Sequence, residues 1–394
     1  MAEQGRNHEQ ILRERLAGAR TLIVGGPRQV GKTAACRTLS PKYLDWNNVA
    51  DRVVLVRGPE AILKHLGLER SRDREATVVI DNVHELRNWK GLLRNLSARY
   101  GARLRLVVTT LEAPRGPRSG LPVSSEVLRL HPWSVGECAR TAPTDSLVKA
   151  PADISDADWA ALLEHGGFPE PFTKRDPRFT GRWYARRQQE LLDSDLPRFA
   201  AVRDPSMIQM LALLLAERSG TPLIYSDLSR ELGVTVDTIR RWMDVVVGLQ
   251  HGFRVRPWFT RVPKALRKEP KWFLRDWSAV TDPLARGRTF IACHLLKAVE
   301  GWTDLGFGQF ELRYVRDKAK REVDFLVLRD RRPWFLVAVA YDEALNPALQ
   351  HFQDCTRARH AFQVVLERPF SPTDCFERTE PAVVSARTLL SQLL

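Results

Sequence analysis

Long apolar runs are missing from this sequence. It contains no stretch of about eighteen uncharged apolar residues, which is the length that a helix needs to cross a bilayer. Residues 1–20 are charged throughout and lack the apolar core of a secretory signal. We therefore expect a cytoplasmic protein with no membrane partner.

Cysteine is also scarce. The chain has five cysteines in 394 residues, an odd number, and they are widely scattered. No two of them have the spacing of a metal-binding pair, which argues against a zinc site and for a reducing compartment. They are Cys36, Cys138, Cys293, Cys355 and Cys375.

Acidic residues are outnumbered by basic ones. The chain has 61 Lys and Arg against 47 Asp and Glu, which gives a formal net charge of +14. An excess of this size fits a polyanionic partner such as nucleic acid. It also fits a general bias of composition toward arginine, and only clustering of the charge separates the two explanations.

A glycine-rich segment near the N-terminus matches the phosphate-binding pattern G-x-x-x-x-G-K-[ST]. An apolar strand is expected at 21–24 and a helix from residue 32, which is the context that the pattern requires. Backbone N–H groups of such a loop face phosphates, its lysine reaches the β- and γ-phosphates, and its last hydroxyl ligates Mg²⁺. We therefore predict ATP and Mg²⁺ as cofactors. The predicted nucleotide-binding residues are Gly26, Pro27, Arg28, Gln29, Val30, Gly31, Lys32 and Thr33.

Two further apolar strands are expected at 78–80 and 104–108. Asp81 follows the first and is predicted to hold Mg²⁺ together with Thr33. Thr109 follows the second, where a polar side chain can sense the γ-phosphate. Three apolar strands separated by helical segments predict a parallel α/β sheet. The alternative is that Asp81 and Thr109 are ordinary strand-end residues.

These residues, in this order, resemble a group of bacterial and archaeal AAA+ ATPases whose C-terminal domain is similar to PD-(D/E)XK nucleases. The resemblance extends over nearly the whole chain. It is carried by 26–33 (GPRQVGKT), 81–89 (DNVHELRNW), 128–137 (LRLHPWSVGE), 166–170 (GGFPE), 267–271 (RKEPK) and 322–325 (EVDF). It implies an AAA+ core at 1–145, a helical lid at 146–220, a winged helix at 221–280 and a restriction-endonuclease-like α/β domain at 281–394.

The chain departs from this family at positions that matter for ATP hydrolysis. The family has a water-polarising Glu where this chain has Asn82, and an amide cannot accept a proton. Losing a positioned base costs roughly 10²–10⁴ in rate. Glu85, one helical turn further on, is a possible substitute. Two family arginines of the kind that contact a neighbouring subunit's γ-phosphate align with Ser124 and Ser194. Arg115, Arg118 and Arg198 lie nearby in the sequence and are possible replacements.

The nuclease-like segment departs in the same way. Asp324 is present, but alanines, Ala338 and Ala340, stand where the Glu and Lys of the next strand are needed. Methyl groups cannot bind a hard cation. An acidic residue expected on the preceding helix aligns with Arg288. We therefore predict a catalytically inactive domain, retained for contact with DNA or with protein.

Basic residues cluster in the predicted winged helix. Between Ile239 and Arg275 there are ten Lys and Arg against only Asp244 and Glu269. Residues 226–235 are typical of a helix, a glycine turn and a helix cap, which suits a helix-turn-helix whose second helix enters a major groove. The alternative is a winged helix used for protein packing. The residues predicted to bind double-stranded or branched DNA are Thr238, Arg240, Arg241, Arg254, Arg256, Arg261, Lys264, Arg267, Lys268 and Lys271.

The combination of an intact phosphate loop with missing catalytic groups leads to one hypothesis. We expect an ATP-binding, DNA-associated protein in which ATP is mainly a structural ligand or slow switch, with weak hydrolysis at most. The alternatives are an active motor that remodels DNA or protein–DNA complexes, an adaptor for a protein partner, and, last, a nuclease. A homo-oligomer is expected by analogy.

Overall fold

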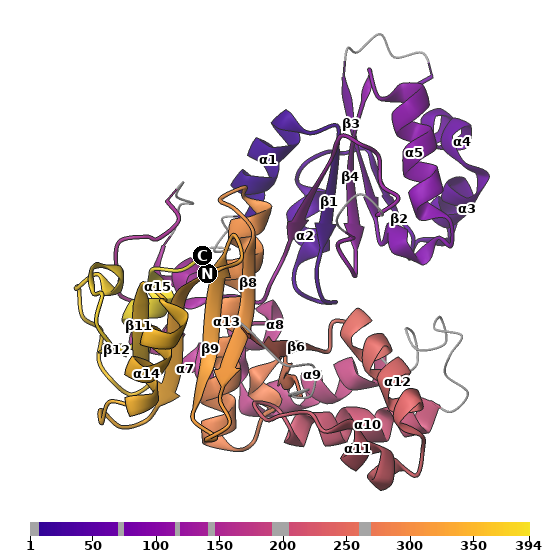
Figure 1. The fold of residues 1–394 in the computed structure, drawn as a ribbon. Helices are drawn as coiled ribbons and strands as arrows, with labels where there is room; N and C mark the ends of the chain where they lie inside the picture. The colour runs from indigo at the N-terminus through magenta and orange to yellow at the C-terminus, as the bar shows by residue number, and fades with distance from the viewer. Residues whose placement is uncertain (1–7, 70–74, 115–118, 141–145, 191–204, 260–268) are drawn as a thin grey trace. The chain divides into compact units, whose positions relative to one another are not determined.

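The computed structural model describes residues 8–69, 75–114, 119–140, 146–190, 205–259 and 269–394. The chain divides into two compact units. The N-terminal unit contains the chain up to His131, and the C-terminal unit contains 132–140 and the chain from Thr144 onward (Figure 1). No helix in the described ranges is long and apolar enough to cross a membrane.

The N-terminal unit is built on a five-stranded parallel sheet in the order β2-β3-β4-β1-β5. This confirms the parallel α/β sheet predicted from the apolar strands. Because β4 lies between β1 and β3, the residues that end these three strands meet at one edge of the sheet. The strands are β1 (Thr21–Gly25), β2 (Tyr43–Asp45), β3 (Ala76–Asp81), β4 (Leu104–Thr110) and β5 (Ser125–Arg129).

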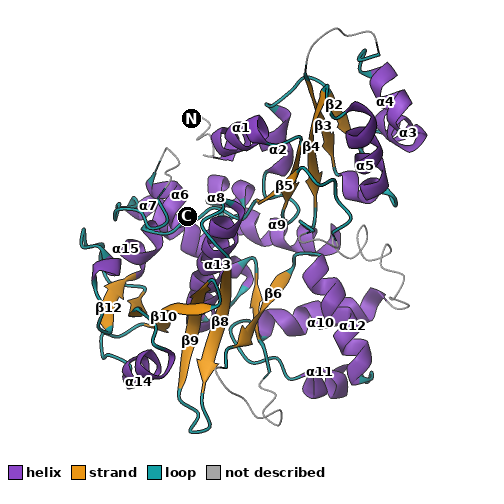
Figure 2. Cartoon of the chain, turned by 45° about the horizontal axis from the view of Figure 1, so that its top comes forward, coloured by secondary structure: helices purple, strands orange, loops and turns teal. Residues whose placement is uncertain are grey.

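Helices cover both faces of this sheet. Figures 1 and 2 show α1 and α2 on one side and α3, α4 and α5 on the other. The second side encloses a core that includes Ile80, Leu93 and Val108, all fully buried. Burying each such side chain contributes roughly 1.5–3 kcal/mol. The helices are α1 (His8–Gly18), α2 (Lys32–Arg37), α3 (Val49–Arg57), α4 (Pro59–His65), α5 (Trp89–Tyr100) and the short 3₁₀ helix η1 (Val83–Glu85).

The C-terminal unit is built on a mixed seven-stranded sheet in the order β12-β11-β10-β9-β8-β6-β7. Strands β8, β9 and β10 run antiparallel, β10, β11 and β12 run parallel, and the β6–β7 hairpin joins through a parallel pairing of β6 with β8. The sheet therefore continues across the boundary that the sequence analysis placed at residue 280. The strands are β6 (Gly252–Pro257), β7 (Lys271–Leu274), β8 (Phe310–Arg316), β9 (Glu322–Arg329), β10 (Arg332–Ala340), β11 (His360–Val365) and β12 (Ala382–Ser385).

Two helices pack against the faces of this sheet. The long helix α13 contributes Phe290 and Trp302 to the larger core, and α14 contributes Leu349 and Phe352 to a smaller core on the other face. Helices α10, α11 and α12 form a separate group in Figure 1. The helices are α6 (Val135–Ala139), α7 (Asp156–His165), α8 (Pro169–Lys174), α9 (Pro177–Glu190), α10 (Pro205–Glu217), α11 (Tyr225–Leu232), α12 (Val236–Gly248), α13 (Pro283–Asp304), α14 (Pro347–Thr356) and α15 (Ala386–Ser391), with 3₁₀ turns η4 (Trp277–Ala279) and η5 (Cys375–Glu377).

Candidate nucleotide site

The glycine-rich segment forms a tight loop between β1 and α2. Gly26, Gln29 and Gly31 have positive φ angles of 151°, 61° and 99°. A Cβ added at Gly26 would lie 2.3 Å from the carbonyl oxygen of Leu130, so only glycine fits there. The ammonium of Lys32 is folded over the loop and donates to the carbonyl oxygens of Gly26 and Pro27, each at 2.7 Å. The loop thus has the conformation and the cation that a phosphate cradle requires.

The carboxylate of Asp81 is the centre of the site. It is fully buried and accepts the Thr33 hydroxyl at 2.7 Å and the backbone N–H of Asn82 at 3.1 Å. The Thr109 hydroxyl also donates to it. The structure therefore brings together Thr33, Asp81 and Thr109, which come from α2, β3 and β4. A hydroxyl and a carboxylate oxygen in direct contact are suitable ligands for Mg²⁺.

Tyr43 is a fourth member of the site that sequence reasoning missed. Its hydroxyl donates to Asp81 Oδ2 at 2.6 Å, and burial together with this carboxylate raises the pKa of the phenol. Tyr43 and Asp45 are two residues apart on β2 and so share a face. The only sequence feature that could have pointed to Tyr43 as a site residue is this alternation, and it lies in a strand of just three residues, Tyr43–Asp45.

Asn82, at the position of the missing base, has a left-handed backbone with φ 55°. Its side-chain amide donates to Asp45 Oδ1 at 3.3 Å. Glu85 is directed elsewhere: its carboxylate, with only 4% of its side chain exposed, pairs with Arg28 of the phosphate loop at 3.1 Å. A carboxylate held by this ion pair is a poor substitute for the missing base. Ser124 is exposed just before β5. Ser194 and the possible replacement arginines Arg115, Arg118 and Arg198 lie outside the described residues.

Comparison with known proteins agrees with this geometry. Residues 18–139 match the family model described as an AAA domain. The N-terminal unit contains an AAA domain. Residues 156–282 match a second model, described only as a domain of unknown function. AAA domains bind ATP, typically with Mg²⁺, and the residues around Asp81 and Lys32 are of the kinds that such binding needs.

Two uncharacterized proteins, from Mycobacterium tuberculosis and Mycobacterium bovis, are each 25% identical to this chain over 267 residues. The match covers 67% of this chain and 56% of theirs, so the chain spans about half the length of these relatives. Among solved structures, the Walker-type ATPase of Pyrococcus abyssi aligns with 14% identity and a TM-score of 0.42, covering 71% of this chain and 94% of that one. RuvB of Thermotoga maritima aligns with 16% identity and a TM-score of 0.30, covering 63% of this chain and 89% of that one.

A short turn joins helices α11 and α12, which the sequence analysis predicted to form a helix-turn-helix. Gly233 ends α11 with φ 64°, and the Thr235 hydroxyl caps α12 by accepting the N–H of Thr238 at 3.2 Å. Ile239 and Met243 are fully buried. The opposite face of α12 is exposed, and the antiparallel hairpin β6–β7 follows it in the chain.

The charges predicted to bind DNA are partly neutralised on this exposed face. Arg240 pairs with Asp237 at 2.7 Å, and Arg254 pairs with Asp244 at 2.8 Å. Arg241 donates to Thr238, and Arg256 is exposed on β6. Arg261, Lys264, Arg267 and Lys268 lie outside the described residues.

Lys271 does not lie on the surface. It is 2% exposed, and its ammonium lies 2.5 Å from Glu322 Oε1 and 3.2 Å from Asp324 Oδ1. This burial corrects the expectation that Lys271 contacts DNA, because an ammonium enclosed by two carboxylates cannot reach a phosphate. Sequence reasoning counted it as part of a basic run and had no means of locating its partners, which come from β9.

The cluster formed by Lys271, Glu322 and Asp324 occupies the position of the predicted nuclease site. Asp324 Oδ2 accepts the N–H of Val339, and Arg288 lies 3.6 Å from Oδ1. Ala338 is 3% exposed within the core beneath α14, and Ala340 ends the same strand half-buried. Within the described ranges no group of three or more His, Cys, Asp or Glu is placed to hold a metal ion. Lys271 and Arg288 thus lie against Asp324, the one acidic residue of the predicted nuclease site.

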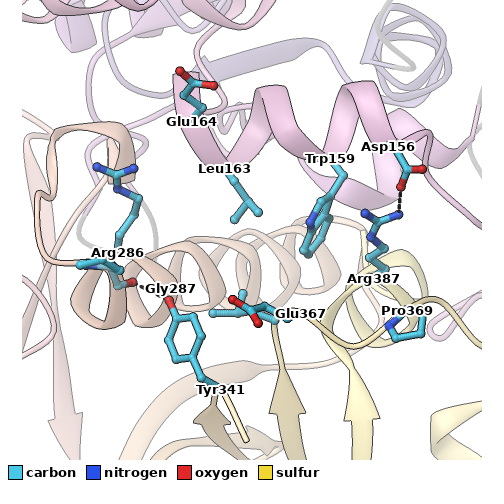
Figure 3. A pocket seen from close by; sticks show the side chains of 12 residues that line it. Asp156, Trp159, Leu163, Glu164, Arg286, Gly287, Tyr341, Glu367, Pro369 and Arg387 are labelled. Atoms are coloured by element: carbon cyan, nitrogen blue, oxygen red, sulfur yellow. Dashed lines mark hydrogen bonds and ion pairs between the residues drawn. The ribbon is translucent and has the colours of Figure 1, made fainter.

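A separate cavity of about 560 Å³ lies in the C-terminal unit between α7, the start of α13 and α15. Figure 3 shows Arg387 paired with Asp156 at one side, while the Tyr341 hydroxyl donates to the carbonyl oxygen of Pro283. Arg387 also lies over the ring of Trp159. The cavity contains none of the residues that the sequence analysis predicted to be functional.

Proposed function

We propose that this AAA protein binds Mg²⁺ and ATP and uses the nucleotide chiefly as a ligand that stabilises an assembled, DNA-associated state, with slow turnover at most. The observation that carries the proposal is the contrast within one site. Lys32, Thr33, Asp81 and Thr109 are assembled around the phosphate loop, whereas Asn82 stands where a proton acceptor is needed.

Each residue has a defined part in binding. The loop from Gly26 to Gly31 offers its N–H groups to the phosphates, and Lys32 contributes a positive charge to the β- and γ-phosphates. Thr33 and Asp81 would hold Mg²⁺, which neutralises the charge of the phosphates when bound. In this proposal Thr109, whose hydroxyl donates to Asp81, senses the γ-phosphate and so distinguishes ATP from ADP.

Slow turnover follows from the groups around Asn82. Its amide can hold a water molecule but cannot take a proton from it, and the loss of a positioned base lowers rates roughly 10²–10⁴-fold. Glu85 is engaged by Arg28. A ligand that is bound and slowly hydrolysed stabilises whichever state binds it better, which is the behaviour of a switch.

The test is to measure ATP binding and ATP turnover with the purified full chain. Lys32→Ala should abolish binding, and Lys64→Ala, an exposed lysine on α4, should leave it unchanged. Nucleotide-dependent assembly, followed by sedimentation velocity, should disappear only in the first variant. An unchanged nucleotide affinity in Lys32→Ala, or fast turnover of several ATP per second by the wild type, would contradict the proposal.

The DNA part of the proposal rests on the helix-turn-helix of α11 and α12 and on the basic run that follows it. The double variant Arg240→Ala with Arg241→Ala should weaken binding to duplex DNA. The slope of the logarithm of the binding constant against the logarithm of salt concentration should fall by the equivalent of about two phosphate contacts. Arg230→Ala is the matched control, because this arginine is 79% exposed on α11, outside the predicted recognition helix. Loss of DNA affinity in the control alone would contradict the assignment of α12 as the DNA-contacting helix. Absence of salt-sensitive DNA binding by the wild type would favour the protein adaptor.

An active motor is the second candidate. The observation that favours it is the presence of another carboxylate, that of Asp45, in contact with Asn82.

A further inference from the structure

We infer that Asp45 is the proton acceptor for residual ATP hydrolysis, replacing the acid missing at position 82. This inference rests on the proposed nucleotide site and adds a residue to it. The contact that motivates it is the 3.3 Å hydrogen bond from the Asn82 amide to Asp45 Oδ1. The carboxylate lacking at position 82 is therefore present on the neighbouring strand β2.

The sheet fixes this placement. Strand β2 is parallel to β3, and its register sets Asp45 beside Asp81 at the carboxyl edge where the site lies. The backbone is held there by hydrogen bonds from Asp45 N to Asp51 Oδ2 at 2.9 Å and from Trp46 N to Asp81 O at 3.1 Å. Tyr43, on the same face of β2, already reaches Asp81.

The carboxylate retains capacity to accept a proton. Oδ1 accepts the N–H of Asn47 at 3.0 Å in addition to the Asn82 amide. Across the part of the chain that the structure describes, Oδ2 of Asp45 accepts no hydrogen bond from the protein, and the side chain is only half-buried. Glu85, the alternative carboxylate, is instead enclosed and paired with Arg28.

The division of roles follows from the chemistry. Asn82 orients the attacking water through its amide, and Asp45 takes the water's proton as the new bond from oxygen to the γ-phosphorus forms. The bond from the γ-phosphorus to the bridging oxygen breaks, and ADP leaves with that electron pair. The products are ADP and inorganic phosphate, and the proton on Asp45 returns to solvent. No further reactant is required.

The decisive experiment compares single-turnover ATP hydrolysis and ATP affinity in four chains. Asp45→Asn keeps the shape and the hydrogen bond to Asn82 but removes the base, so turnover should fall at least tenfold with the ATP dissociation constant within twofold of wild type. Glu60→Gln, which neutralises an exposed carboxylate on α4 outside the site, should behave like wild type. The exchanged pair Asp45→Asn with Asn82→Glu should recover turnover above Asp45→Asn, because it restores one carboxylate and one amide.

The split between rate and affinity separates a base from a structural residue. At saturating ATP, Asp45→Asn should slow the single-turnover rate and leave the ATP dissociation constant unchanged, whereas loss of a structural residue would weaken ATP binding as well. Turnover within twofold of wild type in Asp45→Asn would overturn the inference. The inference would also be overturned if the wild type bound ATP but hydrolysed it no faster than Lys32→Ala. In that case the proposed role of ATP as a structural ligand would still stand. Absence of ATP binding by the wild type would instead overturn the proposed function itself.

Discussion

Replacing Lys271 by methionine tests whether its buried ammonium holds the C-terminal unit together. The side chain is 3% exposed and its two carboxylate partners, Glu322 and Asp324, are 27% and 14% exposed. Removing one member of a buried ion pair costs about 3–5 kcal/mol because the remaining charge is left unpaired. Arg316 and Arg288 lie 3.6 Å from these carboxylates and offset part of that cost.

We therefore expect Lys271→Met to lower the free energy of unfolding by about 3 kcal/mol, the lower end of that range. For a unit of this size the loss corresponds to a fall in Tm of roughly 6–12 °C. The measurement is urea denaturation monitored by tryptophan fluorescence, because Trp272, next to Lys271, is fully buried in the folded chain. The matched control is Lys318→Met, an exposed lysine whose loss should change stability by less than about 0.5 kcal/mol.

A second variant identifies the cause. Neutralising the partners as well, in Lys271→Met with Glu322→Gln and Asp324→Asn, should recover most of the lost stability, because no buried charge then remains unpaired. A loss below about 1 kcal/mol in the single variant, or a triple variant no more stable than the single one, would refute the reasoning.

Three further outcomes follow from individual contacts. Tyr43→Phe should lower the stability of the nucleotide-free protein by about 1.5–3 kcal/mol, measured by urea denaturation, because it removes a hydrogen bond to the charged Asp81. Gly26→Ala should weaken ATP affinity at least tenfold in a binding titration, since its Cβ would collide with the carbonyl oxygen of Leu130; unchanged affinity would contradict the geometry of the loop. Burial lowers the pKa of His294 to about 3, whereas the unfolded chain binds a proton near its ordinary value of 6.5. The free energy of unfolding should therefore fall as pH drops from 6.5 toward 3, by roughly 1.4 kcal/mol per unit from this residue, and His294→Gln should remove that part of the slope in denaturation curves.

The phosphate loop could be predicted from sequence because its signal is local. Residues Gly26 to Thr33 are contiguous, and their conformation depends on glycines and on the strand and helix at either end. Asp81 and Thr109 were predictable for a related reason, because each ends a strand of strong apolar character and parallel strands bring their carboxyl ends to one edge.

Tyr43 and Asp45 could not be predicted as members of the site. Their strand has only three residues, and their proximity to Asp81 depends on β2 pairing with β3. That pairing is chosen by packing between segments some 35 residues apart, for which no short pattern exists. The Arg28–Glu85 pair was missed for the same reason.

The sequence by itself determined the phosphate cradle, the parallel sheet beneath it and the absence of an acid at position 82, because each depends on the identity of residues close together in the chain. Only the tertiary structure decided the position of Lys271 and the extent of the C-terminal sheet. A lysine in a basic run becomes a buried cation once β7 brings it to Glu322 and Asp324 on β9, and β6 joins β8 across more than fifty residues of chain. Pairings of this kind are selected by the burial of whole faces, which no single segment encodes.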